Sequence, residues 1–206
     1  MIPGRIARPT WGRPLGRLDH GRTEVTLTID SPLECRCKRV QLQLSGPPIL
    51  AAECHCNSCR KAGALLLSLP GASRTLEENG GTRFVLYRKD RVRFHGGVDR
   101  LAYLRLGPKS TTRRVVATCC NTPIFLEFEK GHWLSLYGRL WPEGTQPRPE
   151  LRTMTSDLPD PGVLDDDLPN AKRQSLSFFL KLLGAWIAMG FKAPRVSVGP
   201  TEITLR

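Results

Sequence analysis

Seven cysteines in tight groups constrain this chain more than any other feature. They form a Cys-X-Cys, a Cys-X-Cys-X-X-Cys and a Cys-Cys group, at Cys35, Cys37, Cys54, Cys56, Cys59, Cys119 and Cys120. In an extended segment residues i and i+2 face the same side, so Cys54 and Cys56, like the first pair, can offer both sulfurs to one ion. Cys59 follows Cys56 with the two-residue gap of a zinc knuckle. Cysteines that only fill a core would not show these gaps, so the grouping predicts metal binding.

Zinc is the metal that this ligand set favours. It accepts thiolates and requires four ligands at tetrahedral angles. Thiolates also suit iron–sulfur clusters, but the spacing matches neither of the common ferredoxin patterns. A zinc with four thiolates carries a net charge of about −2, which nearby cations offset. Such cations stand beside the first two groups, at Arg36, Lys38, Arg39, Arg60 and Lys61. We expect one or two Zn²⁺ ions per chain and lowered thiol pKa values beside these cations.

Composition limits the class of protein and its partners. The 206 residues are 40% hydrophobic and 24% charged, which suits one core domain. The formal net charge of +12 attracts anions in general. Basic residues are spread along the chain and aromatic residues reach only 7%, so we do not expect nucleic acid to be the main partner. An odd cysteine count without a secretory signal favours the reducing cytoplasm, where grouped cysteines bind metal or react more often than they form disulfides.

Short segments with alternating apolar and polar residues, separated by turn residues, predict a mainly β protein. No strand–helix–strand rhythm accompanies them, so we expect antiparallel β-sheets. The predicted strands are 25–29, 40–44, 65–69, 83–87, 91–95, 101–106, 113–118, 123–128 and 133–137.

The predicted organisation has four parts. Residues 1–22 form a basic arm rich in Arg, Pro and Gly, which serves either as a solvated tail or as an anchor for anions. Residues 23–141 form the zinc-binding β domain. Residues 142–169, rich in Pro, Asp and Thr, are expected to be a surface loop or linker. Residues 170–206 are expected to form a C-terminal amphipathic helix and a tail.

The helix is predicted from apolar residues at three- and four-residue steps. Asn170 is its expected N-cap and Gly190 its expected stop. Lys181 interrupts an apolar stretch shorter than the ~20 residues that a membrane span requires, so we expect no span. We expect the helix to pack on the sheet or on a second copy of the chain, giving a homodimer. The apolar residues are Leu176, Phe179, Leu180, Leu183, Trp186 and Ile187.

Three stretches together resemble the signature blocks of the family of glutathione-dependent formaldehyde-activating enzyme (Gfa) and centromere protein V. They are Cys35-Arg36-Cys37-Lys38-Arg39-Val40, Cys54-His55-Cys56-Asn57-Ser58-Cys59-Arg60-Lys61 and Cys120-Asn121-Thr122-Pro123-Ile124, and the resemblance covers about residues 33–140. It implies an Mss4-like fold of antiparallel β-sheets around zinc, with Cys35, Cys37 and Cys120 as structural ligands. It also implies a second zinc at Cys54, Cys56 and Cys59 with one open coordination position, as a catalytic zinc requires.

The resemblance implies a reaction as well. The named enzyme condenses glutathione with formaldehyde to S-hydroxymethylglutathione, which is carbon-sulfur lyase chemistry in the reverse direction. Zinc would lower the pKa of the glutathione thiol, and Arg60 and Lys61 would attract its carboxylates. The main hypothesis is therefore a zinc-dependent protein acting on a small thiol, such as glutathione, or on its adduct. The alternative is a non-catalytic, zinc-stabilised binding module for an anionic partner.

The last cysteine group departs from the family pattern, which spaces its two cysteines by two residues. Here Ala117 stands at the first position and Cys119 lies directly beside Cys120. Neighbouring side chains of a regular strand point to opposite faces, so both can ligate one zinc only at a bend. Either Cys119 supplies the fourth sulfur from a distorted turn, or this site is incomplete.

The histidines are weaker candidates for the metal sites. His55 should face away from the metal between its two neighbouring cysteines. His95 and His132 are candidates to complete either site, although a lone histidine is more often structural.

Overall fold

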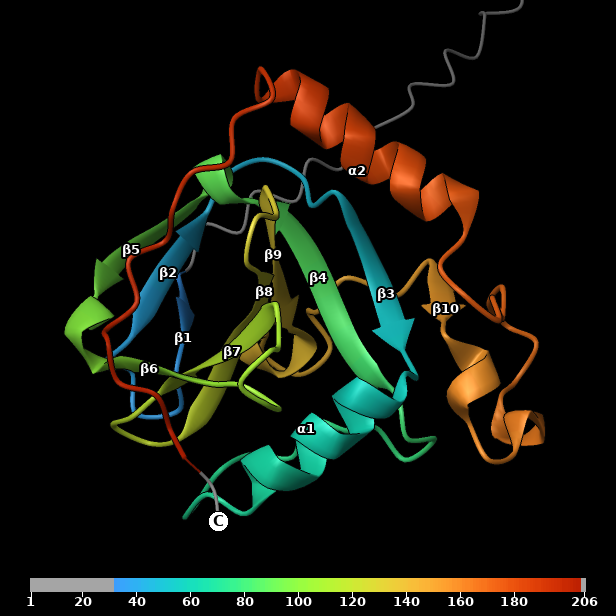
Figure 1. The fold of residues 1–206 in the computed structure, drawn as a ribbon, viewed down its shortest axis with the longest axis horizontal. Coiled ribbons are helices and arrows are strands. Elements are labelled where there is room, and N and C mark those ends of the chain that lie inside the picture. Colours follow the sequence, from blue (N-terminus) through green and yellow to red (C-terminus); the bar gives the residue numbers. More distant parts are fainter. Residues whose placement is uncertain (1–31, 205–206) are drawn as a thin grey trace, which may run out of the picture.

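The computed structural model describes residues 32–204, so the basic arm and the strand predicted at 25–29 lie outside the described residues. Within them the chain forms ten strands and two α-helices (Figure 1). The elements are β1 (Leu33–Glu34), β2 (Gln41–Leu44), β3 (Leu50–Cys54), α1 (Asn57–Leu67), β4 (Thr82–Arg88), β5 (Val92–Gly96), β6 (Leu101–Leu104), β7 (Thr112–Ala117), β8 (Thr122–Phe128), β9 (Trp133–Tyr137), β10 (Leu151–Thr153) and α2 (Leu176–Ala188).

The strands form two sheets, which confirms the mainly β prediction. A three-stranded sheet has the order β1-β2-β5, and a seven-stranded sheet has the order β10-β3-β4-β9-β8-β7-β6. All pairings are antiparallel except that of β10 with β3, which is parallel. The purely antiparallel expectation is therefore wrong at this one edge, where the chain returns through a long connection rather than a hairpin.

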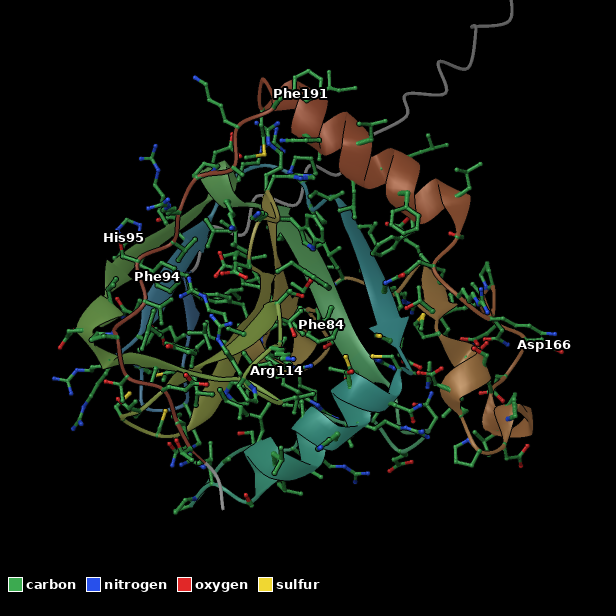
Figure 2. All side chains as sticks on the ribbon, in the orientation of Figure 1. Phe84, Phe94, His95, Arg114, Asp166 and Phe191 are labelled. Carbon is green, nitrogen blue, oxygen red and sulfur yellow. The ribbon has the colours of Figure 1, made fainter. Side chains whose placement is uncertain are left out.

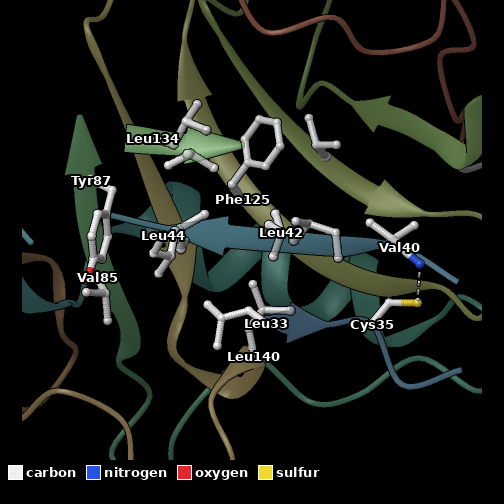
Figure 3. Packing of buried hydrophobic residues seen from close by; sticks show 14 of the residues in the cluster. Leu33, Cys35, Val40, Leu42, Leu44, Val85, Tyr87, Phe125, Leu134 and Leu140 are labelled. Carbon is white, nitrogen blue, oxygen red and sulfur yellow. Dashed lines mark hydrogen bonds between the residues drawn. The ribbon is translucent and has the colours of Figure 1, made fainter. Parts of the chain in front are cut away.

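The main core lies between the two sheets. Leu42 on β2 and Phe125 and Leu134 on the large sheet are fully buried and belong to one cluster (Figure 3). Cys35, 1% exposed, lies at the end of this cluster, where its Sγ accepts a hydrogen bond from the backbone N–H of Val40. The core therefore holds the first cysteine group in place.

The opposite face of the large sheet is covered by the two helices, which lie at opposite ends of β3 and β4 in Figure 1. Leu66 of α1 and Leu182 of α2 are buried in a second cluster with Phe84 and Leu126. The prediction of a strand at 65–69 is wrong, because most of that segment is the last turn of α1. A short apolar run does not by itself distinguish a strand from a helix, and Cys56 caps the N-terminus of α1.

The segment predicted as a loop or linker, 142–169, contains β10 and is anchored in the fold. Leu151, Arg152 and Thr153 of β10 are all buried. Arg152 donates to Glu53 of β3, with 3.3 Å between Nε and Oε1, and to Asp167 at 2.8 Å. The segment thus adds an edge strand to the large sheet, and the four-part division of the chain stays a prediction.

Helix α2 starts later than predicted. Ser175 is its N-cap and accepts a hydrogen bond from the backbone N–H of Phe178, whereas Asn170 hydrogen-bonds to Arg152. Gly190 follows the helix with φ +60°, a conformation that glycine adopts without strain. Neither helix between residues 32 and 204 is long and apolar enough to cross a membrane.

One stripe of α2 faces the sheet, with Leu182 buried and Phe178 half-buried. Met189, the C-cap residue, is also buried. The other large apolar side chains of the helix and of the turn after it are exposed. They are Leu176, Phe179, Leu180, Leu183, Trp186, Ile187 and Phe191. The helix therefore packs on the sheet, as one of the two expectations held, and still presents an apolar outer face.

Candidate metal centres and cavity

Four cysteines meet at one end of the two-sheet core. Cys35, Cys37, Cys119 and Cys120 place their Sγ atoms within 4.8 Å of one another. The hairpin turn 118–121 between β7 and β8 makes this possible, since Asn121 adopts a left-handed conformation with φ +54°. The structure therefore contains the bend that Cys119 and Cys120 need if both are to bind one metal ion.

The spacing of these four sulfurs matches a tetrahedral zinc site. Bonds of ~2.3 Å to a tetrahedral zinc separate the sulfurs by about 3.8 Å. The measured Sγ–Sγ distances are 3.6 Å from Cys35 to Cys37, 3.8 Å from Cys35 to Cys119, 3.2 Å from Cys37 to Cys119 and 4.0 Å from Cys119 to Cys120. The donor set and its size therefore fit a closed four-thiolate zinc site.

The second cysteine group lies at the junction of β3 and α1. Cys54 ends β3, Cys56 is the N-cap of α1, and Cys59 lies in the first turn of the helix. Their Sγ atoms also lie within 4.8 Å of one another. Three thiols supply one ligand fewer than tetrahedral zinc requires, so this group leaves a coordination position for another molecule.

The start of α1 favours negative charge at this second group. The backbone N–H of Cys59 donates to Sγ of Cys56 at 3.3 Å, and the N-terminus of a helix attracts anions. The pKa of Cys56 is well below its usual value, because the thiols of Cys54 and Cys59 and these backbone N–H groups hydrogen-bond to its sulfur. The start of α1 therefore favours negative charge on the sulfur of Cys56.

A cavity of about 460 Å³ opens beside Cys54, Cys56 and Cys59. The large sheet, the first turn of α1 and α2 all contribute to its wall. Its lining is largely apolar and includes Phe84 and Phe178. Arg114 of β7 also lines it, and Figure 2 labels Arg114 and Phe84 on the large sheet. The second cysteine group therefore faces a space that can hold a small molecule, which the four-cysteine group does not line.

His55 points away from the sulfurs, as the extended geometry predicts, and is completely buried. Its Nε2 lies 3.0 Å from Oε1 of Glu53. Burial favours the neutral form of Glu53, but hydrogen bonds from His55, Asn79 and Arg83 outweigh it and lower the pKa of Glu53 to about 2. This network fixes the strand that carries Cys54.

The other two histidines are distant from the cysteines. His132 Nε2 donates to the carbonyl oxygen of Leu182 at 2.9 Å, and His95 is exposed on β5 (Figure 2). Within residues 32–204 no histidine joins either cysteine group, so neither of these two candidates completes a site there.

Arg60 and Lys61 follow Cys59 on α1, but neither lines the cavity. The guanidinium of Arg60 hydrogen-bonds to Asn57 Oδ1 at 2.5 Å and to the carbonyl oxygen of Asp157 at 2.6 Å. Lys61 is exposed. Their binding of a substrate carboxylate stays a prediction.

The sequence argument missed Arg114 as a residue of the site. Its signal was the pair Arg113-Arg114 at the start of a strand that continues as Val-Val-Ala. Neighbouring residues of a strand point to opposite faces. If even one face of the strand is covered, one of two adjacent arginines must therefore point into the covered region.

The sequence profile described as "Glutathione-dependent formaldehyde-activating enzyme" (GFA) matches residues 31–136, which is just over half of the chain and includes all seven cysteines. No curated protein matches the sequence. Among solved structures, the chain is similar to the crystal structure of a Rhodobacter sphaeroides protein, with 17% identity and a TM-score of 0.39, over 57% of this chain and 92% of the other. The chain belongs to the glutathione-dependent formaldehyde-activating enzyme family.

Proposed function

We propose that the protein binds a small thiol at a metal centre formed by Cys54, Cys56 and Cys59, and makes or breaks the carbon–sulfur bond of its aldehyde adduct. The observation that carries this proposal is the difference between the two cysteine groups. One has four thiols at tetrahedral spacing, and the other has three thiols at the wall of a cavity. A saturated site suits structure, and an open one suits ligand exchange.

Zinc is the metal proposed for both groups, giving two ions per chain. Soft thiolate donors without carboxylates or histidines favour it over magnesium, calcium or manganese. When bound at the open site, zinc supplies a Lewis acid that lowers the pKa of a coordinated thiol.

The residues of the chain would do the rest. Cys54, Cys56 and Cys59 would hold the metal, and the N-terminus of α1 would stabilise negative charge beside it. The apolar wall of the cavity would exclude water and so strengthen the electrostatic interactions inside. In the condensation direction the thiol sulfur bonds to the carbonyl carbon of formaldehyde and the thiol proton moves to the carbonyl oxygen. In the lyase direction both steps reverse.

Family membership supports glutathione as the reference thiol for this proposal. It does not favour the alternative of a non-catalytic module for an anionic partner. The basic arm on which that alternative depends lies outside the described residues. A cytoplasmic location stays an expectation, since its reducing conditions keep seven cysteines available for metal.

The test is the rate at which ¹³C-formaldehyde exchanges between its free form and S-hydroxymethylglutathione in the presence of glutathione. NMR measures this rate at equilibrium. Wild-type protein loaded with two zinc ions should accelerate the exchange above the protein-free rate. Cys56→Ser, folded and retaining one zinc, should not. Equal rates with and without the wild-type protein would reject the proposed chemistry, and equal rates for both proteins would reject the proposed site.

A further inference from the structure

Arg114 is a buried cation without an anionic partner among residues 32–204. It is 1% exposed, and no carboxylate oxygen of the described residues lies within 4.0 Å of its guanidinium. Its nearest acceptors are Thr112 Oγ1 and the carbonyl oxygen of Ser58, both at 3.4 Å, and its Nε has no partner. A buried charge that is neither paired nor fully hydrogen-bonded destabilises a fold.

The neighbouring residue Arg113 forms the ion pair that Arg114 lacks among the described residues. Arg113 donates from Nε to Glu127 Oε2 at 2.6 Å, and Lys89 binds the other oxygen of Glu127 at 2.5 Å. Arg113 lies on the other face of β7, outside the cavity. The positive charge of Arg113 is therefore neutralised by a carboxylate of the protein, whereas that of Arg114 is not neutralised by any described residue.

Arg114 lies on the large sheet and lines the same cavity as the second cysteine group. Backbone register places it opposite Leu126 on β8, Leu126 opposite Ser135 on β9, and Ser135 opposite Leu86 on β4. All four residues line the cavity. The contact with Ser58 brings the guanidinium to the first turn of α1, between Cys56 and Cys59 in sequence. A ligand that reaches the sulfurs therefore has a cation within the same space.

Most of the remaining wall is apolar. The sheet and α2 contribute Phe84, Leu86, Leu126, Phe178, Phe179 and Leu182. Asp157 also lines the cavity, but its Oδ2 accepts the backbone N–H of Asn57 at 3.0 Å. Among the described lining residues Arg114 is the one cation, and the neutral polar side chains are those of Ser58, Thr112, Ser135, Thr153 and Gln174. Glutathione carries two carboxylates, an ammonium group and two peptide bonds.

We propose that the cavity binds a small thiol with an apolar body and a single carboxylate, which Arg114 receives while the sulfur lies at Cys54, Cys56 and Cys59. This inference rests on the proposed thiol-binding function and narrows its substrate class. The carboxylate neutralises the buried guanidinium through charge-assisted hydrogen bonds, and the apolar walls cover the chain between the two ends of the ligand. Glutathione, whose second carboxylate finds no second cation among the described lining residues, binds less tightly.

Calorimetry on the zinc-loaded full-length protein tests the carboxylate with a matched pair of probes, 6-mercaptohexanoate and 6-mercaptohexanol. The wild type should bind the carboxylate about 10- to 100-fold more tightly, the range expected for hydrogen bonds to a charged group. Arg114→Gln should lose this preference, Arg114→Lys should restore part of it, and the control Arg113→Gln should keep it in full. Absence of a preference in the wild type, or its persistence in Arg114→Gln, would overturn the proposal.

A second set of measurements separates this role from alternatives. If Arg114 only offset the charge of the metal–thiolate centre, Arg114→Gln would lose one zinc per chain, and that result would overturn the proposal. Should Arg114→Gln fail to fold, Arg114→Met replaces it. We expect Arg114→Met to be at least as stable as the wild type because it removes an unpaired buried charge, and a clear loss of stability would assign Arg114 to the fold instead.

Hexanoate and glutathione complete the probes. Binding of hexanoate that depends on Arg114, without any gain from a thiol, would retain the anion site and reject thiol binding. If thiols bind with equal affinity whether or not they carry a carboxylate, thiol binding is retained and the anion site at Arg114 is rejected. Tighter binding of glutathione than of 6-mercaptohexanoate would overturn the apolar-body part of the inference.

Discussion

The Sγ atoms of Cys37 and Cys119 lie 3.2 Å apart although 82 positions separate them in the chain. The first belongs to the turn between β1 and β2 and the second to the turn between β7 and β8. A metal held here would therefore link the three-stranded sheet to the seven-stranded sheet.

Replacing Cys37 or Cys119 by serine should impair folding. Each variant removes a ligand from the four-thiol group, and binding of structural zinc contributes directly to folding free energy. We expect each to lose one zinc per chain and several kcal/mol of unfolding free energy, or to be insoluble. Metal analysis and urea unfolding measure this, and full stability with full zinc in Cys119→Ser would show that this sulfur is not a ligand.

Cys56→Ser should behave differently. Serine is a good helix N-cap, so the hydrogen bond from the N–H of Cys59 and the start of α1 should survive. We expect a folded protein with one zinc fewer and weakened thiol binding. Circular dichroism and metal analysis on the same sample check both parts, and an unfolded product would contradict the division between a structural and an open site.

Glu53→Gln should destabilise the protein strongly. Glu53 is 1% exposed, and it accepts hydrogen bonds from Arg83 and from Arg152, which joins β10 to β3. Removing the carboxylate charge leaves buried Arg152 with Asp167, 63% exposed at its side chain, as its remaining ion-pair partner. The expected loss is about 3–5 kcal/mol, typical of breaking a buried ion pair. Chemical unfolding measures it, and Glu77→Gln, which breaks the ion pair of Glu77 with the half-exposed Arg139, should cost at most about 1 kcal/mol.

The packing of α2 should weaken in mild acid. Burial lowers the pKa of His132, and the charges of Lys89 and Arg88 add to the effect, although the hydrogen bond to Leu182 opposes it. The unfolded chain therefore binds a proton more readily than the folded one, so this contribution to stability is complete above pH ~6.5 and is lost as the pH falls through the lower folded pKa.

Fluorescence of Trp186, which stacks on His132 with ring centroids 5.6 Å apart, should report this change. His132→Gln keeps a donor for the carbonyl of Leu182 but cannot titrate in this range. Its stability should therefore vary less between pH 7 and 5 than that of the wild type, and an equal pH dependence in both would contradict the assignment.

The exposed face of α2 should mediate self-association, as the homodimer prediction requires. Leu183 is 44% exposed and Ile187 is 54% exposed on this face. The double variant Leu183→Glu, Ile187→Glu should shift sedimentation equilibrium toward the monomer. Val163→Glu, at a side chain 54% exposed outside the helix, should not. A wild-type protein that stays monomeric at all concentrations would refute the prediction.

Much of the β structure could be predicted from local pattern. The predicted segments 83–87 and 133–137 match β4 and β9 closely, because runs of aromatic and aliphatic residues bounded by turn residues mark strands even where consecutive residues are buried. The same rule failed for 65–69, where the residues that decide for a helix lie upstream at Cys56 and Asn57. Three-residue β10 was too short to show any period, and its pairing with β3 depends on the buried contact between Arg152 and Glu53.

The amino-acid sequence by itself determined the chemistry of this protein. The thiol donors and their grouping follow from spacing, because ligands that are close in the chain must be close in space. The family follows from the match of residues 31–136 to its sequence profile. Only the tertiary structure decided how the groups are used. It bent the 118–121 turn so that Cys119 and Cys120 meet Cys35 and Cys37, left the other group one ligand short, and placed the cavity there. It also put Arg114 in that cavity, since contacts between residues 56 positions apart depend on sheet register and helix packing, which no local pattern encodes.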